Sequence, residues 1–167
     1  MNFKYKKMKN KKLFFIVLTL FALPHIIESK AQNITSSRVP PPECMSVELD
    51  GSQTLRSYGT GRNKADAVEQ AKKNAVYAVI FQGITTGKAG CNMRPLVSEV
   101  NARERYEEYF NIFFMDGGEY LKYVSSEDEK NRSKQHVKTK TYANYAVTVR
   151  VLRQDLKKRL MSDNVIK

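Results

Sequence analysis

The stretch GTGRNKADAVEQAKKNA, residues 59–75, places two glycines one residue apart, directly before an alanine-rich helical pattern. From 67 onward the alanines recur every three or four residues, which predicts a helix over 64–82. Asn63 suits the N-cap of this helix, and Gly83 suits its end. Because small side chains let a helix approach a sheet closely, we expect this helix to pack on the strands that precede it.

The two glycines raise the question of a phosphate-binding loop. The residue three positions after Gly61 is Lys64 where a dinucleotide fingerprint has glycine, and the Gly-Lys-Ser/Thr of a P-loop is absent. We therefore interpret Gly59 and Gly61 as a turn from a strand into a capped helix, and no cofactor is expected. The alternative is a weak anion site at the helix N-terminus, formed by Arg62 and Lys64.

The rest of the chain alternates between strand and helix patterns. Asp50-Gly51 is a strong hairpin signal between two alternating segments. The expected elements, in order, are strands at 45–50 and 52–58, helices at 64–82 and from 98, strands at 120–124 and 137–151, and a helix at 153–161. This order, ββααββα, predicts an α+β fold in which a mainly antiparallel sheet of about four strands has helices packed on one face.

The first residues have the three-part layout of a secretory signal peptide. Six lysines between Lys4 and Lys12 precede an apolar run over 13–27 and small residues before Gln32. The run is shorter than the roughly 20 residues that cross a bilayer, although an uncleaved anchor is the alternative. We expect a signal peptide at 1–31, a flexible Pro-rich lead-in at 32–43 and a single domain at 44–167, located in the periplasm or at the outer membrane.

The charge of the chain points away from nucleic acid. The formal net charge is +12, and half of it lies in the leader. The remaining excess of positive charge, beyond residue 31, is small for a nucleic-acid-binding protein, and we expect that part of the chain to be secreted. If the charge has a partner, a peripheral membrane surface or an anionic envelope polymer fits better than nucleic acid; the alternative, which we favour, is that the charge only keeps the domain soluble.

Two cysteines remain after the leader, Cys44 and Cys91. An oxidising compartment favours a disulfide between them. The alternative is two separate buried thiols. With His136 as the one histidine beyond the leader, these residues do not form a recognisable metal-ligand set, so no metal is expected.

The glycine pair and the alanines at 67, 71, 75 and 78 carry a family resemblance. This segment resembles the N-terminal domain of flagellar assembly protein T and related small outer-membrane lipoproteins. The resemblance covers about 45–82, and it covers 136–163 by topology only. It implies a periplasmic or outer-membrane-associated α+β domain with an assembly or interaction role, and it carries over no catalytic residue. The chain departs from that family in lacking a lipid-anchor cysteine and in inserting the aromatic segment 98–124.

The aromatic segment offers the contact residues of a non-enzymatic module with an envelope protein partner. Tyr109, Phe113 and Phe114 are the candidates for apolar contact, and the alternative is that they belong to the core. A second hypothesis is a carbohydrate-active hydrolase that uses Glu104 and Glu108 as paired carboxylates. A third is a soluble ligand-binding domain with a pocket between the sheet and the aromatic helix.

Overall fold

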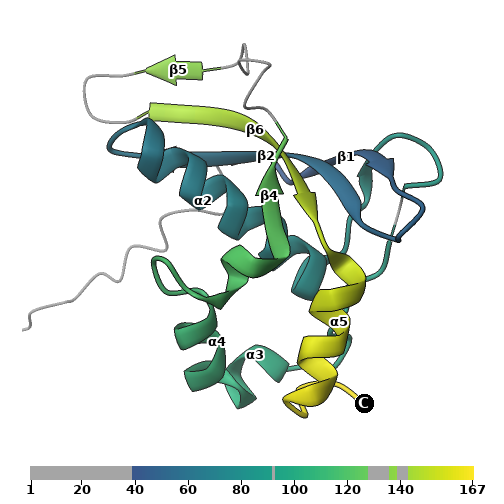
Figure 1. Cartoon of the computed structure of the whole chain (residues 1–167). Coiled ribbons are helices and arrows are strands. Elements are labelled where there is room, and N and C mark those ends of the chain that lie inside the picture. Colours follow the sequence, from purple (N-terminus) through teal and green to yellow (C-terminus); the bar gives the residue numbers. More distant parts are fainter. Residues whose placement is uncertain (1–38, 92, 128–135, 139–142) are drawn as a thin grey trace, which may run out of the picture. The chain divides into compact units, whose positions relative to one another are not determined.

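The computed structural model describes residues 39–91, 93–127, 136–138 and 143–167, all in the compact unit Thr35–Lys167 (Figure 1). The leader, most of the lead-in and most of the charged loop at 125–135 lie outside these residues. The lead-in ends where Thr86 Oγ1 donates a 3.0 Å hydrogen bond to the Pro42 carbonyl, and the first strand begins at Glu43.

A six-stranded sheet forms one layer of the domain. Five strands run in the order β3-β1-β2-β6-β4. The sixth strand, β5, pairs with the first residues of β6, and β4 pairs with the last residues of β6. The strands are β1 (Glu43–Val47), β2 (Gln53–Gly61), β3 (Thr86–Gly87), β4 (Val124–Ser126), β5 (His136–Lys138) and β6 (Ala143–Val151). The β1–β3 pairing is parallel and the other pairings are antiparallel, so the sheet is mixed.

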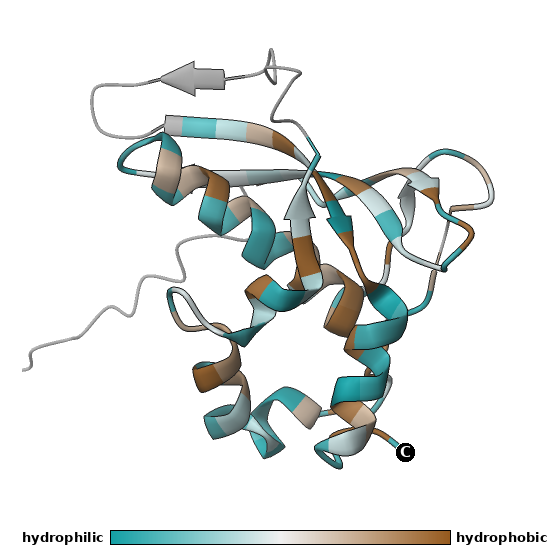
Figure 2. Ribbon diagram, in the orientation of Figure 1, coloured by the Kyte–Doolittle hydropathy of each residue, from teal (hydrophilic) through white to brown (hydrophobic). Residues whose placement is uncertain are grey.

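The described helices lie on one side of the sheet (Figure 1). They are α2 (Lys64–Tyr77) with a π-helical turn (Ala78–Gln82), α3 (Ala102–Arg105), α4 (Glu107–Phe113), a 3₁₀ turn (Glu119–Tyr123) and α5 (Arg153–Ser162). β4 and β6 carry hydrophobic residues where they adjoin the helices (Figure 2). The core includes Leu55, Val149 and Val151 of the sheet, and Leu156 and Leu160 of α5.

The α+β class is confirmed, but the predicted strand count and order differ from the structure. The segment predicted as one strand over 137–151 contains two strands, because Lys138 pairs with Ala143 in antiparallel register and the chain reverses between them. The alternation of side chains continues on both sides of this reversal, which concealed it. The strand expected at 120–124 is a 3₁₀ turn that leads into β4 at Val124. The extra strand β3 has two residues, too few to leave a periodic signal.

The signals that delimit α2 are confirmed. The side chain of Asn63 accepts a 3.0 Å hydrogen bond from the backbone N–H of Asp66, as an N-cap should. At the other end Gly83 adopts φ +75° and donates to the Ala78 carbonyl at 2.8 Å. In the π-helical turn, the carbonyls of Val79 and Ile80 accept hydrogen bonds from the backbone N–H groups of residues 96 and 97. The end of the helix therefore anchors the irregular segment that follows.

A disulfide joins Cys44 of β1 to Cys91, with 5.9 Å between the two Cα atoms. This confirms the predicted pairing, and both cysteines are buried. The backbone N–H of Lys88 also donates a 2.9 Å hydrogen bond to the Cys44 carbonyl. The two cysteines are 47 positions apart in the sequence. A disulfide that closes a loop of that length stabilises a fold by about 4 kcal/mol in the chain-entropy account. The loop after α2 is thus fastened to β1, the strand next to the edge strand β3.

Candidate functional site

Gly59 and Gly61 lie inside β2, paired with Tyr145 and Ala143 of β6, and they do not form a loop. Helix α2 lies directly over them: a Cβ on Gly59 would clash with the Ala67 carbonyl oxygen, and a Cβ on Gly61 would clash with the Ala67 nitrogen. The space that a bound phosphate would need is therefore filled by helix backbone. The turn itself is made by residues 62 and 63, and the glycines serve close packing.

The two predicted anion-binding residues do not converge on a common site. Arg62 Nε lies 3.5 Å from Asp66 Oδ2, so its nearest charged partner is a carboxylate of the first helical turn. Lys64 lines a shallow depression with Lys72, Glu69 and Leu121. The N-terminus of α2 is already capped by Asn63. The arrangement supplies no built cradle for an anion.

All three predicted contact residues of α4 and its C-cap pack against the core. Phe113 is only 2 % exposed and belongs to the core, so its assignment to a contact surface is corrected. Tyr109 and Phe114 are half-buried and pack against the same core. The rings of Tyr109 and Phe113 stack with centroids 5.9 Å apart. The aromatic stripe of this helix therefore faces inward.

The opposite side of α4 exposes apolar side chains that sequence reasoning missed. Ile112 is 59 % exposed and Met115, just beyond the helix, is 56 % exposed. They line a shallow depression together with Glu107, Glu108 and Asn111, and we call these five residues the outer face of α4. The sequence did contain a signal, because Glu108, Ile112 and Met115 follow a helical spacing of four and three on the side away from the aromatic residues.

Glu104 and Glu108, the candidate hydrolase pair, are both solvent-exposed and lie on two different short helices. The break between α3 and α4 falls at Tyr106, whose φ of −110° and ψ of 31° are not helical. Because both side chains are open to solvent, the geometry lends the hydrolase hypothesis no support.

A chain of polar contacts ties α4 to α5. Tyr109 donates a 2.7 Å hydrogen bond from its hydroxyl to Asp163 Oδ2, and Arg159 Nε lies 2.8 Å from the same oxygen. Arg159 also pairs with Glu119 at 2.9 Å. Burial, and then the bond to Asp163, raise the pKa of Tyr109 well above its ordinary value. Its phenol therefore stays a neutral donor, which suits a structural tie better than proton transfer.

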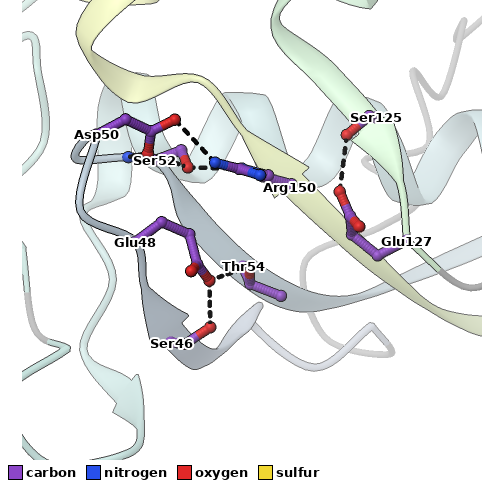
Figure 3. A network of polar contacts seen from close by, with 8 residues as sticks. All are labelled: Ser46, Glu48, Asp50, Ser52, Thr54, Ser125, Glu127 and Arg150. Carbon is purple, nitrogen blue, oxygen red and sulfur yellow. Dashed lines mark hydrogen bonds and ion pairs between the residues drawn. The ribbon is translucent and has the colours of Figure 1, made fainter.

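A second polar network fixes the tip of the β1–β2 hairpin (Figure 3). Asp50 accepts hydrogen bonds from the Ser52 hydroxyl at 2.6 Å and from Arg150 Nη2 at 2.8 Å. Arg150 Nε also donates to the Ser52 hydroxyl at 2.7 Å. The side-chain bond from Ser52 is the main reason that the pKa of Asp50 is lowered. These bonds run from Arg150 of β6 to Asp50 and Ser52, so the network holds the hairpin to β6.

Among the described residues, no group of three or more His, Cys, Asp or Glu side chains is placed to hold a metal ion. No helix in the same ranges combines the length and apolar character needed to cross a membrane, and the apolar run of the leader lies outside them. The side chain of His136 is likewise outside what the structure describes.

Comparison with known proteins gave no match to a family model, to a curated protein or to a solved structure. The resemblance to the flagellar assembly domain therefore stays a prediction. A functional proposal has to rest on the outer face of α4 and on the other surfaces of this fold.

Proposed function

We propose that the chain is a secreted, non-enzymatic envelope protein that binds a protein partner through the outer face of α4. The observation that carries the proposal is the exposure of Ile112 and Met115 in one shallow depression. The leader pattern supports secretion, and a buried disulfide is typical of proteins from oxidising compartments.

Burying the exposed side chains of Ile112 and Met115 against a partner would favour association. Fully burying a side chain of this size stabilises a complex by about 1.5–3 kcal/mol, so Ile112 and Met115 together could anchor a small interface. An apolar centre with a polar rim is the usual anatomy of such surfaces.

Charge complementarity indicates the kind of partner. Glu107 and Glu108 flank the apolar pair, and both are exposed. Two carboxylates at the rim would be repelled by an anionic lipid surface or an anionic polymer, and they would attract lysine or arginine. A basic amphipathic segment of another protein is therefore the occupant that fits this face.

Photocrosslinking in intact cells of the natural host tests the proposal. A photoreactive amino acid at position 112 should capture one discrete protein, and capture should be lost when Met115→Glu is added. The matched control is a photoreactive residue at Val100, which is 80 % exposed but lies outside the outer face of α4. Equal capture of the same species at 100 and 112, or no capture at 112 from correctly exported protein, would contradict the proposal.

A further inference from the structure

A groove lies between α2 and the α3–α4 segment, and among the described residues it shares only Asn111 with the outer face of α4. One wall comes from α2 and the π-helical turn that follows it, and the other comes from α3, α4 and the residue that follows α4. The lining residues, which we call the aromatic groove, are Gln70, Lys73, Asn74, Tyr77, Phe81, Arg103, Phe110, Asn111 and Phe114.

The floor of the aromatic groove is a set of interlocked rings. The centroids of Phe81 and Phe110 are 4.7 Å apart in an edge-to-face contact, and those of Tyr77 and Phe81 are 4.9 Å apart. Tyr77 also lies 6.1 Å from Phe114. Tyr77, Phe81 and Phe114 are only half-buried, so part of each ring faces the groove. Because the rings hold one another in place, this apolar surface exists before any ligand arrives.

The groove carries positive charge. The described residues that line it include Lys73 and Arg103 and no carboxylate. Lys73 forms an ion pair with Asp116, which lies outside the lining. Arg103 donates a 3.1 Å hydrogen bond to the Tyr77 hydroxyl and lies 5.5 Å from the centre of that ring. In the described ranges no acidic side chain is paired with this guanidinium, so its charge is available to a ligand.

Amide side chains complete the walls. Asn74 Nδ2 donates to the Tyr58 carbonyl at 2.8 Å, and Gln70 Nε2 donates to Asn74 Oδ1 at 2.9 Å, so both amides are held in fixed orientations. Asn111 is exposed on the opposite wall. A groove with an aromatic floor, fixed amides and an uncompensated guanidinium combines the apolar surface and the few placed polar groups of a small-ligand site.

We propose that the aromatic groove binds a carboxylate attached to a ring that has an apolar face. The carboxylate would be bound by Arg103, which matches its geometry with paired donors, and the ring would lie against Tyr77 and Phe114. Two kinds of compound share this chemistry, uronic acid sugars and aromatic acids. The depression lined by Lys64 and Lys72 lacks such a floor and contains Glu69, so it fits this ligand less well.

Titration calorimetry on the purified exported protein at low ionic strength tests the proposal. One arm uses digalacturonic acid with neutral digalactose as its control, and the other uses 2-naphthoate with 2-naphthamide. We expect at least one acid to bind at least about tenfold more tightly than its neutral analogue, a difference of about 1.4 kcal/mol. The arm that responds identifies the source of the ligand. Failure of both acids to bind, or equal binding of acid and neutral analogue, would overturn the proposal.

A pair of variants assigns the effect to the groove. Arg103→Gln should weaken binding of the acid about tenfold while leaving the neutral analogue unchanged. Arg105→Gln is the control, because Arg105 lies on the same short helix but pairs with Glu99 and does not line the groove. Both side chains are exposed, so neither change should affect folding. An equal loss in the two variants would overturn the proposal, as would no loss in Arg103→Gln. Crosslinking at position 112 should be the same in both variants, so this inference and the partner proposal can fail separately.

Discussion

The contact between β2 and α2 and the contact around α4 solve the same packing problem in opposite ways. Under α2, the backbone of β2 approaches the helix backbone closely, because Gly59 lies beneath Ala67. The small Ser57 side chain fits there too, and its Oγ donates a 2.8 Å hydrogen bond to the Ala71 carbonyl. Around α4, large rings fill the space instead, with Phe110 and Phe113 buried. The contact under α2 accepts only the smallest side chains, whereas several kinds of large apolar side chain could fill the space around α4. Sequence patterns are accordingly more informative about the first contact than about the second.

The largest effect should come from the core side of α4. Phe113→Ala should lower the free energy of unfolding by about 4 kcal/mol, because the ring leaves a cavity among its neighbours. The neighbouring Ile112→Ala should change it by no more than about 0.5 kcal/mol, as expected for an exposed position. Urea unfolding of the oxidised protein measures both. Similar losses in the two variants would mean that the inner and outer sides of α4 are wrongly assigned.

A smaller loss should follow from adding one methyl group under α2. Gly59→Ala should cost about 3 kcal/mol, because the new Cβ meets helix backbone that cannot rotate away. Gly90→Ala is the matched control: Gly90 has φ +80° but no atom within 4 Å of the added carbon, so only a backbone cost of about 1 kcal/mol is expected. Equal costs in urea titrations would show that α2 does not lie as close to β2 as described.

The tie between α4 and α5 should be weaker than either packing contact. Tyr109→Phe removes the hydrogen bond to Asp163 and should cost about 1.5 kcal/mol, since the acceptor is charged and half-buried. Tyr106→Phe provides the comparison, because the Tyr106 hydroxyl makes a longer, exposed 3.2 Å bond to the Asn164 carbonyl. That change should cost no more than about 0.5 kcal/mol. Thermal unfolding measures both losses of stability. A larger loss in Tyr106→Phe than in Tyr109→Phe would contradict the prediction that the bond to Asp163 is the stronger of the two.

The smallest effect should appear as a pH dependence at the hairpin tip. The pKa of Asp50 is lowered below its ordinary value of 3.8, mainly by the hydrogen bond from Ser52. Its contribution to stability is therefore complete above the pKa of the unfolded chain, near 3.8, and is lost as the pH falls through the lower pKa of the folded state. Melting temperatures of the native protein should decline in that acid range more steeply than those of Asp50→Asn. Parallel curves would show that Asp50 does not titrate differently in the folded state.

Local signals account for the parts of the fold that could be predicted. The hairpin at Asp50-Gly51, the cap at Asn63 and the end at Gly83 each depend on one residue type in one backbone geometry, and each appears in the structure. The reversal between β5 and β6 was missed, because a period of two residues continues unchanged on either side of a turn.

The candidate sites were harder to predict, for two physical reasons. Helical spacing places the aromatic residues and Ile112 on different sides of α4, but both sides carry apolar residues, so spacing alone does not say which side faces the core. The aromatic groove brings Arg103 against Tyr77, 26 positions away in sequence, and short-range periodicity cannot report such a contact. The disulfide could be predicted from the two cysteines and an expected oxidising compartment, but the loop it fastens could not.

The close approach of α2 to β2 also limits how the sequence can drift over evolutionary time. Where only a hydrogen atom fits between two backbones, residues 59 and 61 cannot change to larger types unless the helix moves away from the sheet. Ala67 and Ala71, fully buried at the same contact, are constrained together with them. Surface helices such as α4 carry no equivalent restriction. A distant homologue should therefore keep the spacing Gly-x-Gly-x5-Ala-x3-Ala after its surface residues have diverged beyond recognition, which makes that spacing a more durable marker of descent than overall identity.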